Sequence, residues 1–252
     1  MLSRDEIRAN VAAVNARIEE ACARTGRKRD EVTLVAVSKT FPAEAIEYAV
    51  AAGITHVGEN RVQEAREKRM DPRLQPGVSP AKAGAPLAGA GAPLAKAGAP
   101  LAEAGAPIWH LIGHLQSNKA KDAVKLFDVI ETVDSLNLAE KIARAAEAQG
   151  KRQDVLLQIN VGREEQKSGA DPRDAASIAK EIASMDSLLL RGLMTIPPED
   201  DNPRRWFSEM NAIRNDLGLK ELSMGMSHDY EIAIEEGSTI VRVGRAIFGA
   251  RG

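Results

Sequence analysis

The chain has 252 residues, of which 44% are hydrophobic and 28% charged, as is usual for a folded globular protein. Its 34 basic and 36 acidic residues leave a net charge of -2, which excludes the strongly basic surface of a protein that binds nucleic acid or anionic membranes. Aromatic residues make up only 3%, so a platform for stacking bases is not expected either.

The sequence also indicates the compartment of the protein. Cys22 is the single cysteine, so neither an internal disulfide nor a cysteine-rich metal centre is expected. Residues 1–6 include acidic side chains and start no long apolar run, which is unlike a secretory signal. No stretch is long and apolar enough to cross a bilayer. We therefore expect a protein of the reducing cytoplasm.

Strand and helix patterns alternate along the chain after an N-terminal helix, which is expected over residues 3–24. Ser3 and Glu6 have the spacing of a capping box, and an apolar face with helical spacing continues to Cys22. Residues 32–37 form an apolar, β-branched run that is typical of a strand buried on both faces. Further strands are expected over residues 55–57, 108–112, 129–132, 155–161, 188–194, 221–224 and 239–243, and helices over 42–51, 61–69, 117–126, 135–149, 172–184, 204–217 and 229–236.

This order of elements predicts the fold class. Eight strands that alternate with helices indicate parallel strands joined by right-handed crossovers. Eight such units in a chain of this length favour an α/β fold closed into a single TIM-type (β/α)8 barrel, with an extra N-terminal helix. An open, doubly wound sheet is the alternative.

Residues 71–107 interrupt the alternation with a segment of low complexity. A seven-residue unit, Ala-Gly-Ala-Pro-Leu-Ala followed by one variable residue, repeats between positions 83 and 108. Proline and glycine in every repeat exclude a coiled coil. We expect a flexible loop that interrupts one domain spanning residues 1–252, because surface loops accept long inserts at little cost in free energy. A docking arm for a partner is the functional alternative.

Lys39 is the first candidate for chemistry. It follows the strand expected over residues 32–37, so it should stand at the mouth of the barrel, where the active sites of this fold lie. Partial desolvation there favours the neutral amine, which can attack an aldehyde. A lysine that extends into solvent is the simpler explanation for this residue taken alone.

A phosphate site is expected beside it. Gly225-Met226-Ser227 follows the seventh expected strand and Gly244-Arg245 follows the eighth, where barrels of this kind bind phosphate. Glycines let the backbone approach phosphate oxygens, and Ser227 is expected to cap a helix that begins near His228 and favours an anion. With Lys39, these loops indicate a phosphorylated aldehyde or another small phosphorylated substrate.

Arg242 lies within the last expected strand. If it points inward, its fixed charge needs an acceptor, either a pyridine nitrogen or a carboxylate; an outward-facing salt bridge is the alternative. A metal site is not expected, because Glu59, His110, His114 and His228 lack the spacing of a ligand set.

Longer motifs resemble those of the pyridoxal phosphate homeostasis protein family, over nearly the whole chain except residues 71–107. The matching segments are Val35-Ala36-Val37-Ser38-Lys39-Thr40, Gly58-Glu59-Asn60, Trp109-His110-Leu111-Ile112-Gly113, Leu115-Gln116-Ser117-Asn118-Lys119, Gly192-Leu193-Met194, Ser223-Met224-Gly225-Met226-Ser227, Gly237-Ser238-Thr239 and Val241-Arg242-Val243-Gly244. The repeat insertion is foreign to this pattern, as are His114, where proline is commoner, and Arg245, where threonine is common.

The resemblance implies a barrel like the N-terminal domain of alanine racemase, with pyridoxal 5′-phosphate (PLP) as the cofactor. Lys39 matches the residue that forms a Schiff base with PLP, and Arg242 matches the arginine that faces the pyridine nitrogen. Members of the family are regarded as binding and delivering the cofactor, without an established catalytic reaction. The expected cofactor-binding set is completed by Asn60, Met226, Ser227, Gly244 and Arg245, the last through its backbone N–H.

Three functions are weighed on this basis. The first is a monomeric, non-enzymatic carrier that buffers PLP and delivers it to PLP-dependent apo-enzymes. The second is a fold-type-III PLP enzyme such as an amino-acid racemase, which needs a second base from a separate β domain; only eight residues follow Gly244, so such a domain is not expected. The third is a lysine aldolase without cofactor, which would place Lys39 among acidic neighbours that its flanking residues do not supply.

Overall fold

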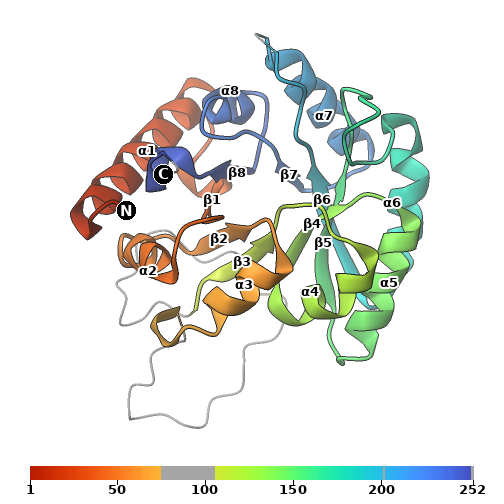
Figure 1. The fold of residues 1–252 in the computed structure, drawn as a ribbon. Helices are drawn as coiled ribbons and strands as arrows, with labels where there is room; N and C mark the ends of the chain where they lie inside the picture. The colour runs from red at the N-terminus through yellow and green to blue at the C-terminus, as the bar shows by residue number, and fades with distance from the viewer. Residues whose placement is uncertain (75–105, 201, 251–252) are drawn as a thin grey trace.

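The computed structural model describes residues 1–74, 106–200 and 202–250, so residues 75–105 of the loop predicted over 71–107 lie outside the described residues. At the start of that loop, Pro72–Leu74 forms a 3-10 turn. Eight parallel strands form a closed barrel in the order β1 to β8, surrounded by helices (Figure 1). The barrel closes where β1 pairs with β8, with Thr33 opposite Ile240 and Val35 opposite Arg242. The predicted closed barrel is confirmed, and the open sheet is wrong.

The strands lie close to their predicted ranges. They are β1 Thr33–Val37, β2 His56–Glu59, β3 Ile108–Leu111, β4 Val129–Val133, β5 Gln153–Gln158, β6 Leu188–Met194, β7 Glu221–Ser223 and β8 Ile240–Val243. The helices are α1 Arg4–Arg24, α2 Ala43–Ala51, α3 Val62–Arg69, α4 Ala120–Leu126, α5 Leu136–Glu147, α6 Ala175–Ala183, α7 Arg204–Asp216, α8 Tyr230–Glu235 and α9 Arg245–Phe248.

Two predicted helices differ from the structure at their starts, and one helix was not predicted. The helices expected over residues 117–126 and 172–184 begin as 3-10 turns, Ser117–Lys119 and Pro172–Asp174, before α4 and α6. In the second turn the Asp171 side chain accepts the Arg173 N–H, which satisfies one donor of the helix start. Helix α9 has only four residues, too few for a periodic pattern to reveal.

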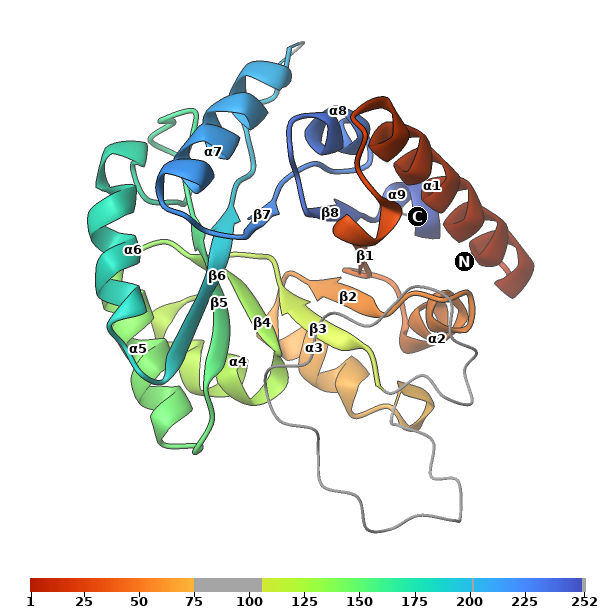
Figure 2. The ribbon, with the colours of Figure 1, turned by 180° about the vertical axis from the view of Figure 1, so that it is seen from behind.

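Helix α1 is the predicted N-terminal helix, and it packs against α2, α8 and α9 (Figure 2). Its capping box is confirmed: Ser3 Oγ accepts the Glu6 N–H, and Glu6 Oε2 accepts the Ser3 N–H at 2.7 Å. Such a cap stabilises a helix by about 1 kcal/mol. Cys22 is buried on the apolar face of α1, as expected of a small core residue.

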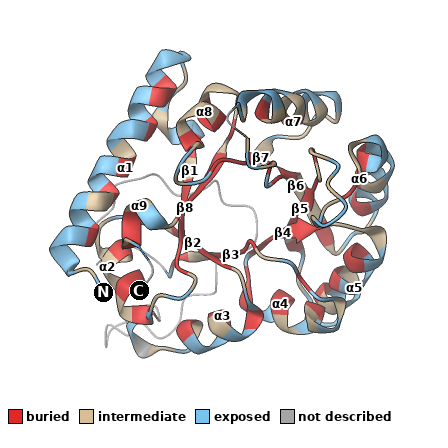
Figure 3. Cartoon of the chain, turned by 45° about the horizontal axis from the view of Figure 1, so that its top comes forward, coloured by how far each residue is buried: buried red, intermediate tan, exposed pale blue. Residues whose placement is uncertain are grey.

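Buried residues form two separate clusters, one between the strands and the helices and one inside the barrel. Figure 3 shows buried residues along the strands and on the helix faces that turn toward them. The apolar part of the interior is small and consists of Val35, Leu156, Met194 and Ile240. The rest of the interior holds polar and charged side chains, which are described below. None of the helices in the described ranges has the length and apolarity that crossing a membrane requires.

Candidate cofactor-binding site

A cavity of about 710 Å³ opens among the loops that follow the strands at their carboxyl ends. Its walls come from the ends of β1, β2, β3, β6, β7 and β8. It brings together all seven residues proposed from the sequence, although they span more than 200 positions: Lys39, Asn60, Met226, Ser227, Arg242, Gly244 and Arg245. Sequence reasoning missed other lining residues, among them Phe41, Ile112, Ile196 and Glu199.

Lys39 enters this pocket from a sharp turn at the end of β1. Ser38, just before it, is buried, and its N–H donates to the Gly58 carbonyl on β2 at 3.0 Å. Thr40, just after it, has φ of 70°, in the left-handed region that non-glycine residues rarely adopt. The turn leads the chain to Pro42, which caps α2, and leaves Lys39 half-buried on the pocket wall.

The loop after β7 has a different geometry from the one predicted. Helix α8 begins at Tyr230 and its N-cap is Asp229, so the prediction that Ser227 caps this helix is wrong. The reason is a turn in which the Met226 carbonyl accepts the N–H groups of Asp229 and Tyr230, which delays the start of the helix. Ser227 lies within that turn and lines the pocket.

Gly225 allows the loop after β7 to lie close against α8. Its φ is +90°, and a Cβ at this position would lie 2.5 Å from the Ala233 Cβ and 2.9 Å from the Tyr230 Cα. Only glycine fits here, so the chain can fold closely against α8 and present Met226 and Ser227 to the pocket.

Gly244 and Arg245 form the second loop, between β8 and α9. Gly244 is the N-cap of α9, and a Cβ on it would lie 3.1 Å from the Val37 carbonyl oxygen on β1. The first N–H groups of a helix have no acceptor within the helix, so those of α9 are donors available at this end. The Arg245 side chain is exposed, and its Nη1 donates to His228 Nε2 at 3.1 Å.

Arg242 points into the barrel and is 3% exposed, so the outward-facing salt bridge is wrong. Its Nη1 donates to Ser223 Oγ at 2.5 Å, and its Nη2 donates to the Thr195 carbonyl at 2.8 Å. Glu131 Oε2 lies 3.8 Å from Nη1. Burial lowers the pKa of Arg242, and the nearby Glu131 charge opposes that shift. The hydrogen-bond acceptors of Arg242 are therefore groups of the protein, and its counter-charge is the Glu131 carboxylate.

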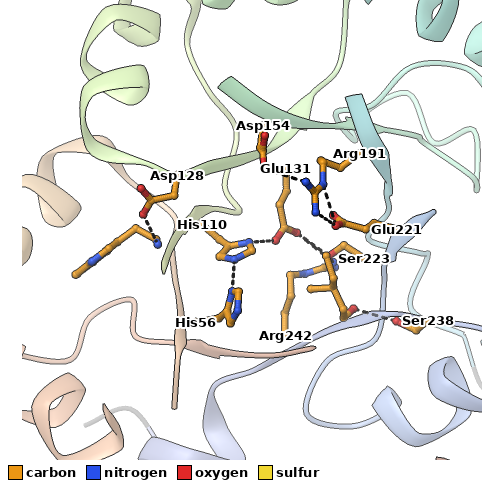
Figure 4. A network of polar contacts seen from close by, with 12 residues as sticks. His56, His110, Asp128, Glu131, Asp154, Arg191, Glu221, Ser223, Ser238 and Arg242 are labelled. Carbon is orange, nitrogen blue, oxygen red and sulfur yellow. Dashed lines mark hydrogen bonds and ion pairs between the residues drawn. The ribbon is translucent and has the colours of Figure 1, made fainter. Parts of the chain in front are cut away.

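Arg242 ends a buried chain of polar contacts, here called the barrel network: His56, His110, Glu131, Ser223 and Arg242 (Figure 4). Ser223 Oγ donates to Glu131 Oε2 at 2.6 Å, and His110 Nδ1 lies 2.6 Å from Glu131 Oε1. His56 Nδ1 lies 2.8 Å from His110 Nε2. Sequence reasoning missed His56, Glu131 and Ser223, whose one signal is a polar residue within a short strand of the predicted barrel.

The charges on the barrel network follow from its geometry. Burial and the neighbouring His110 lower the pKa of His56 to about 3, so His56 is neutral at pH 7. Burial alone would raise the pKa of Glu131, but the hydrogen bond from His110 and the charge of Arg242 hold it below its usual value. An ionised Glu131 only accepts, so the His110 Nδ1–H donates to Glu131 Oε1.

The residues weighed as metal ligands lie apart from one another. His110 belongs to the barrel network, Glu59 binds Lys68 on the helix side of β2, and His228 pairs with Arg245. His114 is exposed near Asp134. Within the described ranges, no three His, Cys, Asp or Glu side chains are grouped as metal ligands would be.

Comparison with known proteins identifies the family. The model of the alanine racemase N-terminal domain family matches residues 3–252. The pyridoxal phosphate homeostasis protein of Aquifex aeolicus (strain VF5) is 36% identical over 244 residues, which cover 93% of this chain and 94% of that protein. The chain belongs to the pyridoxal phosphate homeostasis protein family. The resemblance found in the motifs is thus confirmed.

Solved structures agree with this assignment to the pyridoxal phosphate homeostasis proteins. PipY of Synechococcus elongatus PCC7942, whose structure has PLP bound, is 34% identical and superposes with a TM-score of 0.71, covering 92% of this chain and 100% of PipY. An alanine racemase of Clostridium difficile 630 is 16% identical with a TM-score of 0.64, covering 98% of this chain and 57% of the racemase. The second likeness is one of fold alone.

Proposed function

We propose that this protein binds PLP in the pocket beside Lys39 and takes part in intracellular PLP homeostasis, buffering the cofactor and delivering it to apo-enzymes. One observation carries the proposal. A single pocket collects an amine from the end of β1, two phosphate-type loops from β7 and β8, and the buried Arg242. The PLP bound in PipY and the names of the relatives support it.

The residues present fit the cofactor. PLP brings an aldehyde that a lysine amine converts to a Schiff base, and Lys39 is the lysine that lines the described pocket. Ser227 and the N–H groups at Gly244 and Arg245 would hold the phosphate. Arg242, kept charged by Glu131, would face the pyridine nitrogen, and Asn60 and Met226 would contact the ring side.

A non-enzymatic carrier is the function that we favour. The relatives that match over nearly their full length are called homeostasis proteins, whereas the likeness to alanine racemase is one of fold. A fold-type-III PLP enzyme such as a racemase is the second candidate, because Lys39 and Arg242 would be shared with it. We further propose one domain over residues 1–252, acting as a monomer in the cytoplasm.

Absorbance tests the proposal. The purified protein with PLP should show an imine absorbance band at about 420 nm that is absent in Lys39→Ala. Borohydride reduction should attach the cofactor covalently to the peptide that contains Lys39, as detected by mass spectrometry. A protein that stays colourless with added PLP would refute the binding proposal.

Two further assays separate carrier from enzyme. The loaded protein should restore the activity of a PLP-dependent apo-enzyme when the two are mixed. Racemisation of an amino acid by the wild-type protein, lost in Lys39→Ala, would establish the enzyme instead. Light scattering after size exclusion tests the monomer, and deletion of residues 75–105 with retention of the imine band tests the single domain.

A further inference from the structure

Lys68 on α3 lies beneath the turn that carries Lys39, and it is only 8% exposed. Its ammonium donates to the Ser38 carbonyl at 2.7 Å, to Glu59 Oε1 at 2.6 Å and to Glu64 Oε1 at 2.7 Å. An ammonium has three N–H donors, so each is used. Full pairing is what makes a charge at this depth tolerable. We call Lys68, Glu59 and Glu64 the Lys68 cluster.

The Lys68 cluster holds the backbone on both sides of Lys39. Before it, Ser38 gives its carbonyl to Lys68 and its hydroxyl to Glu59. After it, the Thr40 N–H donates to Glu64. The left-handed conformation of Thr40 is unfavourable by about 1–2 kcal/mol, so it persists only where surrounding contacts hold it.

The Lys68 cluster lies outside the cofactor pocket. His56 and Gly58 on β2 face the barrel interior, where they meet His110 and Val35, so Glu59 faces the helices. Burial raises the pKa of Glu59, while the charge of Lys68 and the Ser38 hydroxyl lower it. The described residues that line the pocket include none of the three. The Lys68 cluster can therefore act on the pocket through the backbone of the turn at residues 38–40.

We propose that Lys68 is a positioning residue, which through Glu59 and Glu64 fixes the turn 38–40 so that the Lys39 amine meets an aldehyde in the pocket. The inference rests on the proposed function of Lys39. In the step concerned, Lys39 Nζ bonds to the aldehyde carbon, and the carbonyl oxygen leaves as water with the two amine protons. Such a reaction depends steeply on the orientation of the amine. The loop of Ser227 packs against α8, and Gly244 lies against Val37 of β1, which pairing with β2 holds in place. Binding of a phosphate should therefore survive the loss of the Lys68 cluster.

The test separates bond formation from capture of the cofactor, in the full-length protein freed of PLP. Stopped-flow absorbance follows imine formation with PLP, and calorimetry measures binding of pyridoxine 5′-phosphate, which has no aldehyde. The variants are Lys68→Met and Glu64→Ala. The control is Arg66→Met on the same helix, which removes an ion pair to Asp122 (2.8 Å) without touching the turn.

In Lys68→Met and Glu64→Ala we expect imine formation to slow by about tenfold, equal to about 1.4 kcal/mol. Affinity for pyridoxine 5′-phosphate should change by less than about threefold, well under 1 kcal/mol. Arg66→Met should alter neither, and Lys68→Arg should recover part of the rate. If Lys68→Met does not fold, as judged by circular dichroism, Glu64→Ala decides alone because that side chain is partly exposed.

Two results would overturn the inference. One is a wild-type rate of imine formation in the folded variants. The other is an equal loss of imine formation and of pyridoxine 5′-phosphate affinity, which would mean a general structural role. A wild-type protein that binds pyridoxine 5′-phosphate but forms no imine with PLP would instead refute the role of Lys39, and this inference with it.

Discussion

Glu131 on β4 is the counter-charge of Arg242 on β8, with its Oε2 3.8 Å from the Arg242 Nη1 and the Ser223 hydroxyl bonded to both. The side chains of Glu131 and Arg242 lie in the barrel interior, where water does not screen their charges. An unpaired ion there is strongly unfavourable, so each residue makes the other possible. Arg242 lines the pocket, whereas Glu131 is not among the described residues that line it. Glu131 would therefore hold Arg242 in place for the cofactor without contacting the cofactor itself.

Glu131→Gln should therefore destabilise the protein by about 3–5 kcal/mol, because it leaves the buried Arg242 charge without its partner. Urea unfolding followed by circular dichroism measures the change. As the control, Glu140→Gln on α5 removes an exposed ion pair to Arg144 and should change stability by less than about 0.5 kcal/mol. Equal stability of Glu131→Gln and the wild type would show that Arg242 does not depend on Glu131.

His56 gives the stability of the protein a pH dependence. Its pKa falls from 6.5 to about 3 on folding, so between these values the unfolded state binds a proton that the folded state does not. Stability should then decrease as the pH falls below 6.5, by at most about 1.4 kcal/mol per pH unit from this group. Urea titrations at pH 6.5, 5.8 and 5.0 measure the slope of stability against pH. Glu131 stays ionised over this range, because its pKa lies below its usual value.

His56→Asn should reduce that slope, since asparagine keeps a hydrogen-bonding partner for His110 but does not titrate. The control His114→Gln removes an exposed histidine and should leave most of the slope in place. Parallel slopes in wild type and His56→Asn would contradict the assignment.

Gly225→Ala should weaken PLP binding as well as stability. A Cβ at a φ of +90° and 2.5 Å from Ala233 forces the loop of Met226 and Ser227 away from α8, with a loss of about 1–3 kcal/mol. Gly218→Ala is the matched control: its φ is +64°, but nothing lies within 4 Å of the new Cβ. Both variants should lower the melting temperature, and only Gly225→Ala should lower the affinity for PLP, measured by fluorescence titration.

Arg245 allows its side chain and its backbone to be tested separately. Arg245→Ala should change PLP affinity by less than about threefold, because the guanidinium pairs with His228 and the phosphate would bind the N–H. Arg245→Pro removes that N–H at the first residue of α9. Circular dichroism checks that the variant folds, because Gly244 just before it is in the α region that a following proline disfavours. We expect its affinity to fall by about tenfold or more, since a hydrogen bond to a charged group contributes about 1.5–3 kcal/mol. A larger loss in Arg245→Ala than in Arg245→Pro would assign the contact to the side chain.

The sequence by itself determined the barrel and the set of residues at its mouth. Alternating strand and helix patterns are local, and in a parallel barrel every strand ends at the same face, so Lys39, Ser227 and Gly244 had to meet there. Patterns of this kind do not reveal an element as short as α9, nor the turn at the Met226 carbonyl that delays the start of α8.

Only the tertiary structure decided what surrounds those residues. Whether Arg242 turns inward, and which carboxylate balances it, depends on barrel closure, which brings β4 to β8 across the interior. Lys68 likewise reads as an ordinary helical lysine until α3 packs against the ends of β1 and β2. The physical reason is that buried charges are paired by three-dimensional proximity: the buried partners Glu59 and Glu131 lie 9 and 111 positions from Lys68 and Arg242 along the chain.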